Sequence, residues 1–251
     1  MKKQFQILAA TFITVAFISC SKEIIESPES NNFEEIATGK GGGNSLVPVS
    51  GKGLLGRFEF NGDLKDATGQ LHDGVSNVGR VLYTTDRKGQ ADKAIRFNAG
   101  YGVDIFNVPS TPDGATMSVW IQHDTLPNPG WISSVFSLKG FILQQNYNFF
   151  AGSFQTGLLG TNQLVQETSG TDKKWHHMAI TRDNNDLRFY IDGVLIGIAP
   201  TPAGTGPFDP TDQYSVGYAY PYDIYWKGSM DDLRFYKRVL TPAEINTLAN
   251  S

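Results

Sequence analysis

The chain has 251 residues, of which 40% are hydrophobic and 12% aromatic, so it can bury one large core or two small ones. Its 27 glycines, 12 prolines, 16 phenylalanines and 10 tyrosines favour an all-β protein with many turns. The net charge is −4 and there is no Lys/Arg stripe, so the composition gives no indication of a nucleic-acid partner.

The first nineteen residues have the pattern of a targeting segment. Lys2 and Lys3 precede "FQILAATFITVAFIS", an apolar stretch too short to span a bilayer comfortably, and the stretch ends at Cys20, the only cysteine. This arrangement resembles a bacterial lipobox, which implies cleavage before Cys20 and acylation of its sulfur. The alternative is an ordinary secretory signal in which Cys20 is incidental, but an unpaired thiol is unexpected in an exported protein. We therefore expect 1–19 to be a lipoprotein signal peptide and Cys20 to anchor the chain to a membrane.

Residues 20–50 predict a flexible tether. The stretch carries five glutamates, a glycine run and few aromatic residues, so it cannot bury enough apolar surface to fold. A flexible segment of this length spans about 30 Å root-mean-square, which separates a domain from a membrane without fixing its orientation.

Residues 51–251 predict one all-β domain: a two-sheet antiparallel β-sandwich of the jelly-roll type with a short C-terminal helix. Short alternating segments begin at Leu54 and are separated by turn signals such as "NGD", "DATG", "DNND" and "DG". The strands are expected at 54–60, 94–97, 102–106, 115–121, 131–137, 140–145, 174–182, 186–192, 194–199, 213–217 and 229–237. The helix is expected in "TPAEINTLAN", where Thr241 is the N-cap, Pro242 is at N1 and Glu244 at N3 completes a capping box.

The stretch "WHHMAITRDNNDLRFYIDGV" at 175–194 predicts part of a three-stranded meander over 174–199. Asp192-Gly193 is the strongest short hairpin signal. Because neighbouring side chains on a strand face opposite ways, His176 and His177 cannot together ligate one metal ion. We expect His177, which shares its face with Trp175, to be a buried, hydrogen-bonded core residue.

Five segments, in order over 54–248, resemble laminin-G-like, concanavalin A-like lectin/glucanase jelly-roll domains. The segment with Trp175, His177, Asp192 and Gly193 is similar to the signature W-H-H-V-A-V-T-R-D…L-R-L-Y-V-D-G. The others are "FEFNGDLKDATGQLHDG", "ADKAIRFNAGYGVDI", "ATMSVWIQ" and "GSMDDLRFYKRVLTPAEI". The resemblance implies the fold more strongly than an activity, since this fold hosts lectins, adhesion modules and enzymes.

A structural Ca²⁺ is one expectation from the resemblance. In "SMDDLRFY", a period of two puts Asp231 on the same face as Leu233 and Phe235, where a carboxylate needs a cation or several N–H donors. The resemblance implies that Asp63 and Asp66 of the opening loop are the other ligands. The alternative is that these carboxylates cap turns or pair with basic side chains and backbone groups.

A glycan-binding surface is the second expectation. The segment "YSVGYAYPYDIYWKG" at 214–228 concentrates tyrosines, and rigid aromatic faces stack on sugar rings. The proposed ligand-binding residues are Tyr218, Tyr220, Tyr222 and Trp131. The alternative assigns most of these aromatic side chains to core packing.

Catalysis is not expected. The sequence has no E-x-D-x-E strand, nucleophile elbow, P-loop or H-E-x-x-H, although a pair of aspartates including Asp232 stays open. We therefore expect a non-catalytic module that binds carbohydrate and is lipid-anchored at the outer membrane or cell surface, similar to lipoproteins of Bacteroidetes-type bacteria. The first alternative is an adhesion module for a protein partner in the envelope, and the second is a glycoside hydrolase or lyase.

Overall fold

The computed structural model describes residues 49, 51–98, 100–124, 132–138, 141–146, 149–154, 163–167, 172–201, 214–219 and 224–251. The predictions for the signal peptide 1–19, for Cys20, for the tether apart from residue 49, and for Trp131, Tyr220 and Tyr222 lie outside these residues. Within these ranges the structure contains no helix that is long and apolar enough to cross a membrane.

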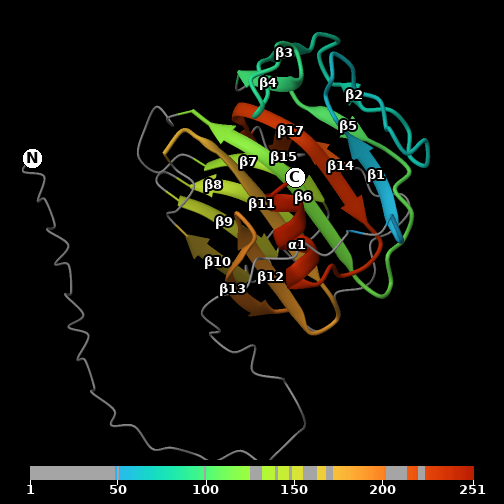
Figure 1. The fold of residues 1–251 in the computed structure, drawn as a ribbon, viewed down its shortest axis with the longest axis vertical. Helices are drawn as coiled ribbons and strands as arrows, with labels where there is room; N and C mark the ends of the chain where they lie inside the picture. Colours follow the sequence, from blue (N-terminus) through green and yellow to red (C-terminus); the bar gives the residue numbers. More distant parts are fainter. Residues whose placement is uncertain are drawn as a thin grey trace, which may run out of the picture. The chain divides into compact units, whose positions relative to one another are not determined.

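Within these ranges the strands form two large antiparallel sheets packed face to face, as predicted (Figure 1). The first sheet has the order β13-β12-β11-β6-β17-β4-β3, and β1 also pairs with β17. Its strands are β1 (Leu54–Phe58), β3 (Leu82–Thr84), β4 (Ala94–Asn98), β6 (Ala115–His123), β11 (Trp175–Arg182), β12 (Asp186–Ile191), β13 (Val194–Pro200) and β17 (Lys227–Tyr236).

The second sheet has the order β10-β9-β8-β7-β14-β5-β2. Its strands are β2 (Val75–Ser76), β5 (Val103–Ile105), β7 (Ile132–Leu138), β8 (Phe141–Asn146), β9 (Phe149–Phe154), β10 (Gln163–Glu167) and β14 (Tyr214–Val216). A small ribbon of β15 (Tyr218–Ala219) and β16 (Ile224–Tyr225) and the helix α1 (Pro242–Ala249) complete the described elements.

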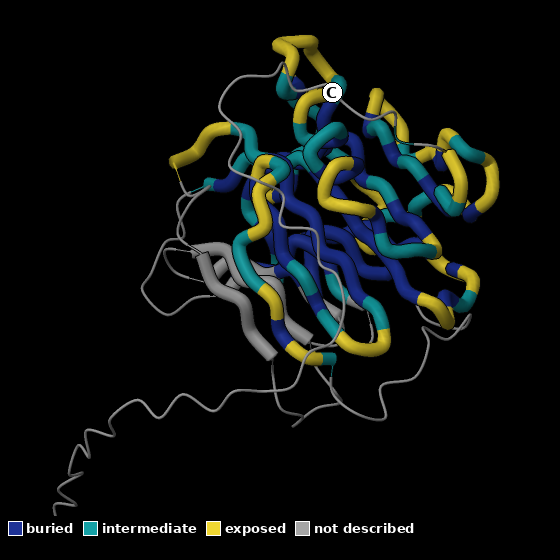
Figure 2. Tube along the Cα trace, turned by 60° about the horizontal axis from the view of Figure 1, so that its bottom comes forward, coloured by how far each residue is buried: buried dark blue, intermediate teal, exposed yellow. Residues whose placement is uncertain are grey.

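The main core lies between the sheets, where buried residues of β1, β4, β6, β11, β12 and β17 meet those of β5, β7 and β14. Figure 2 shows the buried parts of the chain in dark blue. Met178 and Ile180 of β11 and the apolar alternation of β12 belong to this core, as the period of two predicted. The predicted meander over 174–199 is therefore confirmed in strands β11, β12 and β13.

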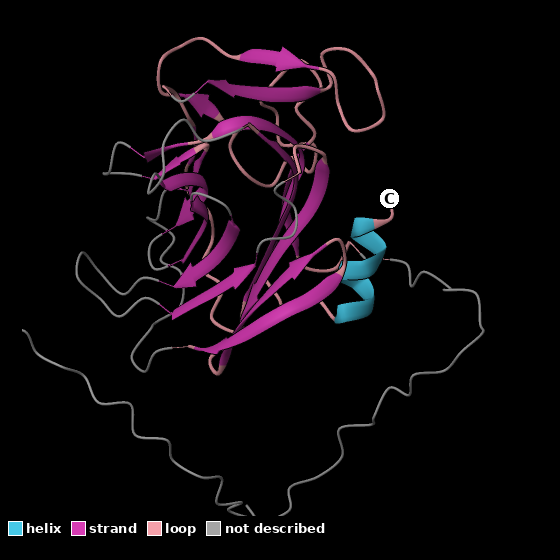
Figure 3. Cartoon of the chain, turned by 90° about the vertical axis from the view of Figure 1, so that its left-hand side faces the viewer, coloured by secondary structure: helices cyan, strands magenta, loops and turns pink. Residues whose placement is uncertain are grey.

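Helix α1 covers part of the first sheet on the face away from the second sheet, which we call the outer face (Figure 3). Its Ile245 and Leu248 pack with Ala179 of β11 and Tyr190 of β12 in a second apolar cluster. The predicted capping box is confirmed: the Thr241 hydroxyl accepts from the Glu244 backbone, and the Glu244 side chain accepts from the Thr241 backbone.

Strand β17 contains a β-bulge that reverses the predicted orientation of Asp231. Between the pairs Asp231↔Trp120 and Arg234↔Ser118, β17 carries one residue more than β6, and Asp232 takes the left-handed conformation at φ 46°. Met230 and Leu233 are both in the core, so Asp231 points to the outer face instead of sharing the face of Leu233. The prediction of an inward Asp231 was wrong because the extra residue breaks the period of two.

The bulge falls at a seam in the sheet. On the side of β17 away from β6, strand β4 pairs with Lys227–Met230 and strand β1 pairs from Leu233 onward. Asp231 and Asp232 occupy the gap between these two neighbours. Two consecutive carboxylates are thus presented together where the ladder is interrupted.

Candidate functional site

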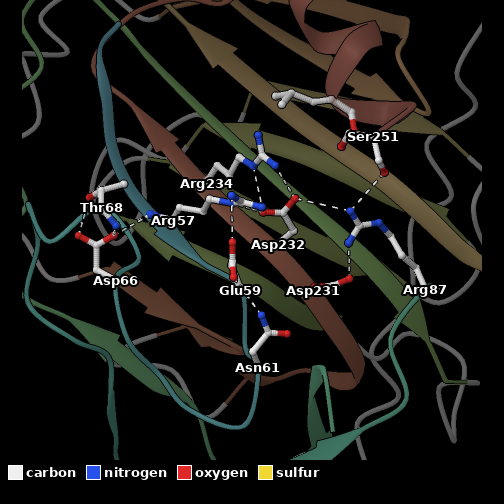
Figure 4. A network of polar contacts seen from close by, with 11 residues as sticks. Arg57, Glu59, Asn61, Asp66, Thr68, Arg87, Asp231, Asp232, Arg234 and Ser251 are labelled. Atoms are coloured by element: carbon white, nitrogen blue, oxygen red, sulfur yellow. Dashed lines mark hydrogen bonds and ion pairs between the residues drawn. The ribbon is translucent and has the colours of Figure 1, made fainter. Parts of the chain in front are cut away.

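A polar cleft opens on the outer face at this seam. It has a volume of about 170 Å³ and is formed by β1 with the residues after it, the loop 86–90 and the bulge. The lining side chains are Arg57, Glu59, Asn61, Asp86, Arg87, Lys88, Gln90, Asp231 and Asp232. Figure 4 shows how the side chains from β1, the loop and β17 point toward one another.

Asp232 is the centre of the polar network on the floor of this cleft. Arg234 holds it with two parallel bonds, from Nε to Oδ1 at 3.0 Å and from Nη2 to Oδ2 at 2.6 Å, and Arg57 Nε donates to Oδ1 at 2.9 Å (Figure 4). Burial acts to raise the pKa of Asp232, but the hydrogen bonds and positive charges of Arg234 and Arg57 outweigh it and lower the pKa to about 2. Asp232 is therefore ionised and fixed in orientation.

Asp231 pairs with a different guanidinium. Its Oδ2 accepts a hydrogen bond from Arg87 Nη1, and both side chains are nine-tenths or more buried. Burial raises the pKa of Asp231 to about 6, and the charge of Arg87 only partly opposes this effect. The two neighbouring carboxyl groups therefore lose their protons over different pH ranges.

Arg87 also covers Trp120 of β6. Its guanidinium carbon lies 5.1 Å from the centroid of the indole ring, and Trp120 in turn meets the ring of His177 edge-on at 5.5 Å. Within the described residues, Arg87 Nε, Trp120 Nε1 and His177 Nδ1 are buried without a hydrogen-bond partner. Beside the charged floor, the two aromatic rings and the guanidinium group of Arg87 thus lie in contact, and each carries one of these unpartnered nitrogen atoms.

The rim of the cleft is more exposed. Glu59 pairs with Arg57 Nη1 at 2.9 Å and accepts from Asn61 Nδ2 at 2.9 Å. Asp86 Oδ1 accepts the backbone N–H groups of Lys88 at 2.9 Å and Gln90 at 2.7 Å, which closes the turn that carries Arg87. The rim therefore offers one accessible carboxylate, two amides and an ammonium group close together, whereas Asp86 is buried.

Asp66 of the opening loop is satisfied by the loop itself. Its Oδ1 accepts the backbone N–H groups of Arg57 at 2.8 Å and Thr68 at 3.0 Å. Its Oδ2 accepts the Thr68 hydroxyl at 2.7 Å and the backbone N–H groups of Gln70 at 2.9 Å and Leu71 at 2.8 Å. Burial acts to raise the pKa of Asp66, but these hydrogen bonds together lower it.

The three carboxylates expected for calcium do not share one site. Asp63 is exposed and accepts the Lys65 backbone N–H at 3.2 Å, Asp66 holds its own loop, and Asp231 pairs with Arg87. In the part of the chain that the structure describes, no group of three or more His, Cys, Asp or Glu side chains is arranged to hold a metal ion. The positive charges beside the bulge are guanidinium groups, so the donor set does not fit a shared Ca²⁺. Calcium binding itself stays a prediction.

Tyr218, the one predicted ligand-binding aromatic within the described residues, is buried at 6% exposure. Its hydroxyl donates a short hydrogen bond to Asp104, and its ring stacks on Tyr225 at 6.0 Å. Trp226 in the same segment is fully buried in the main core. The structure therefore places Tyr218 in packing rather than on an exposed surface, as the alternative interpretation held for most of this segment.

The two histidines have different surroundings, as the strand period predicted. His176 bonds Asp192 Oδ2 at 2.7 Å and Asp172 Oδ1 at 2.9 Å, and the bond to Asp192 is the largest cause of its raised pKa. His177 is buried at 2% exposure, and burial lowers its pKa to about 3. Its backbone N–H donates to Asp192 Oδ1 at 2.9 Å, while its ring Nδ1 is one of the unpartnered atoms above.

The predicted signature residues serve the scaffold. Asp192 and Gly193 form the turn of the β12–β13 hairpin with φ values of 49° and 80°, and a Cβ on Gly193 would lie 2.9 Å from Asn246 Cα of helix α1. Trp175 begins β11 and pairs with Gln122 of β6. None of these residues lines the cleft.

Sequence reasoning missed the basic half of the cleft. The alternation in "RFEFN" places Arg57, Glu59 and Asn61 opposite Phe58 and Phe60, a pattern typical of any solvated strand face. Arg87 stands in the loop "TDRKGQ", and its pairing with Asp231 spans 144 residues of sequence. Nothing local in the sequence indicates that long-range contact.

The fold that carries this cleft, two antiparallel sheets of a jelly-roll sandwich with one short C-terminal helix, is that of a concanavalin A-like domain. Residues 97–246 match the family model described as the concanavalin A-like lectin/glucanases superfamily, so the chain belongs to this superfamily. No curated protein matches the sequence.

Solved structures share the fold at low sequence identity. Domain 4 of AbnA, an extracellular GH43 arabinanase from Geobacillus stearothermophilus in complex with arabinotriose, has a TM-score of 0.55 and 22% identity over 78% of this chain and 98% of that domain. The binding domain of Paraclostridial Mosquitocidal Protein 1 has a TM-score of 0.63 and 17% identity over 79% of this chain and 52% of that chain. Botulinum neurotoxin type C, whose cell entry depends on interaction with two ganglioside molecules, has a TM-score of 0.61 and 14% identity over 79% of this chain and 51% of that chain. The chain thus spans about half of each toxin structure.

Proposed function

We propose that this chain is a non-catalytic module that binds carbohydrate in the polar cleft at the β17 bulge. The observation that carries the proposal is the lining of the cleft, in which carboxylates, guanidinium groups, amides and an ammonium group lie together on the outer face of the first sheet. A sugar hydroxyl both donates and accepts, so it is complementary to carboxylates beside guanidinium and amide groups. Membership of the superfamily and the glycans named for two similar structures support the same assignment.

The absence of catalysis is part of the proposal. Both oxygens of Asp232 accept from Arg57 and Arg234, while Asp231 pairs with Arg87 through Oδ2 alone, so the pair does not offer two free carboxyl groups. A nucleophile or acid of a glycosidase needs an oxygen free to meet the anomeric carbon or the leaving group. Incubating the chain with the polysaccharides that it binds, and assaying for new reducing ends, tests this part.

Isothermal titration with a panel of neutral oligosaccharides tests the binding itself. The variants Asn61→Ala and Gln90→Ala remove exposed amides of the rim and should each weaken binding several-fold without changing the fold. Asn184→Ala, an equally exposed amide in the turn before β12, is the matched control and should bind as the native chain does. Silence across a broad glycan panel would contradict the proposal.

A protein partner is the second candidate, favoured by one observation. Strand β13 is the last strand of its sheet in the described part of the chain, and it exposes 61% of Val194, 42% of Leu195 and 55% of Ile198. Association that is lost on Ile198→Lys, while glycan binding is kept, would support it.

Membrane anchoring through Cys20 is also a proposal, carried by the sequence alone. Metabolic labelling with palmitate should mark the native chain and not Cys20→Ser. Fractionation of cells would then show whether the labelled chain is at the outer membrane.

A further inference from the structure

The charge balance of the cleft indicates which sugars it takes, an inference that rests on the proposed function and deepens it. The lining carries four carboxylates and three cationic side chains, and Arg234, which holds Asp232 from beside the lining, balances the fourth negative charge. The charged groups of the floor are paired with one another: Asp232 with Arg57, and Asp231 with Arg87.

A charged ligand would have to break one of these pairs. The side chains of Arg87, Asp231 and Asp232 are only 10%, 6% and 6% exposed, so a group that lost its partner would stay desolvated. A uronate or sialate carboxylate would also meet the four carboxylates of the lining at close range. An ammonium group would meet Arg57, Arg87 and Lys88 at close range.

An uncharged hydroxyl leaves the ion pairs intact. Carboxylate oxygens that face the cleft can accept from a sugar hydroxyl, and N–H groups can donate to its oxygen, so vicinal hydroxyls can span an acceptor and a donor together. The lining contains no aromatic side chain, so recognition depends on hydroxyl arrangement rather than on stacking. At about 170 Å³ the cleft is smaller than the roughly 300–1,000 Å³ of pockets for drug-sized ligands, and it suits a single sugar ring.

We propose that the cleft is a subsite for one uncharged, hydroxyl-rich sugar ring, and that it discriminates against acidic and cationic sugars. Glu59, with a side chain 35% exposed at the rim, is the most accessible carboxylate of the set and accepts from a ligand hydroxyl. Its partner Arg57 is anchored by Asp232 and keeps its position when Glu59 is changed.

Matched ligands test this proposal by isothermal titration with the full chain. The pairs are galactotriose against trigalacturonate, lactose against 3′-sialyllactose, and N-acetylchitotriose against its deacetylated form. We expect a neutral member to bind at least about tenfold more tightly than its charged counterpart. Its dissociation constant should change by less than about twofold between roughly 0.1 and 1 M salt, because no ligand charge is screened.

The variant Glu59→Gln should weaken binding of the neutral ligand about fivefold, since a charge-assisted hydrogen bond becomes one to a neutral amide oxygen, while Asn184→Ala leaves binding unchanged. Tighter, salt-sensitive binding of the acidic or cationic member would overturn this inference and leave glycan binding standing. If Glu59→Gln and Gln90→Ala both bound the neutral ligands as tightly as the native chain does, the sugar would bind outside this cleft. Failure of both members of every pair would overturn the proposed function as well.

Discussion

His176 and His177 are adjacent on strand β11, yet their imidazole pKa values move in opposite directions. His176 is held between the carboxylates of Asp192 and Asp172, which raise its pKa, whereas burial lowers the pKa of His177 to about 3. The two rings therefore make opposite contributions to the pH dependence of stability.

For His177 the folded pKa lies below the ordinary value of 6.5, so the unfolded chain takes up the proton first. Its contribution to stability is complete above pH 6.5 and is lost as the pH falls toward 3, by up to about 1.4 kcal/mol per pH unit. We expect His177→Gln to show a flatter decline of unfolding free energy over this range. Urea titrations at a series of pH values measure the unfolding free energy. If its slope against pH were the same in His177→Gln and in the native chain, the low pKa of His177 would be contradicted.

For His176 the sign is reversed. Its folded pKa lies above 6.5, so the stabilisation is present below pH 6.5 and is lost as the pH rises through the folded pKa. His176→Gln should therefore cost more stability at pH 6 than at pH 9. Direct titration of the His176 ring by NMR gives an independent check, because this ring should lose its proton at a higher pH than a free imidazole does.

The pair Arg87–Asp231 should behave as a buried ion pair. Removing only the cation leaves a desolvated carboxylate, so Arg87→Gln should lower the unfolding free energy by about 3–5 kcal/mol at pH 8. Adding Asp231→Asn should restore part of this loss. A double-mutant cycle measures the coupling, and additive effects of the two changes would show that the pair does not act as a unit.

The same pair predicts a pH effect for the single variant Asp231→Asn. Because the folded pKa of about 6 is above the ordinary 3.8, the contribution of Asp231 is complete below pH 3.8 and is lost as the pH rises through 6. The variant should therefore be more stable relative to the native chain at pH 8 than at pH 4. Thermal melts at the two pH values decide the sign.

Asp66 should be essential for the opening loop. Asp66→Ala leaves four backbone N–H groups without their acceptor, at a cost of about 1–3 kcal/mol for each donor that water cannot reach. We expect a large fall in Tm, whereas Asp63→Ala, the exposed control, should be nearly neutral. Melts with calcium and with a chelator complete the test, and a midpoint raised by calcium would mean that carboxylates exchange their present partners for the metal.

Tyr218 should contribute to stability rather than to ligand binding. Tyr218→Phe removes the hydroxyl that donates to Asp104 and should cost about 1–3 kcal/mol, while sugar binding in the cleft is kept. Loss of glycan binding without loss of stability would instead return Tyr218 to the ligand site.

The sequence was sufficient for those features that a regular period controls. The sandwich, the faces of Met178 and Leu187, the hairpin at Asp192 and the capping box at Thr241 all follow from alternation or from local turn chemistry. The orientation of Asp231 did not follow, because one extra residue shifts the period without any compositional mark. The role of Arg87 did not follow either, since only the assembled sheet brings its loop onto β17.

At the bulge, strand β17 has one residue more than strand β6, and that residue is Asp232. The core residues Met230 and Leu233 lie before and after the two aspartates. Deleting Asp232 would join Asp231 directly to Leu233 in an unbroken ladder, with Met230, Leu233 and Phe235 still inward. Arg57 and Arg234 would then lose the carboxylate that they share. An insertion or deletion at this point, unlike a substitution in the core, would add or remove the Asp232 carboxylate without moving a core side chain to the other face.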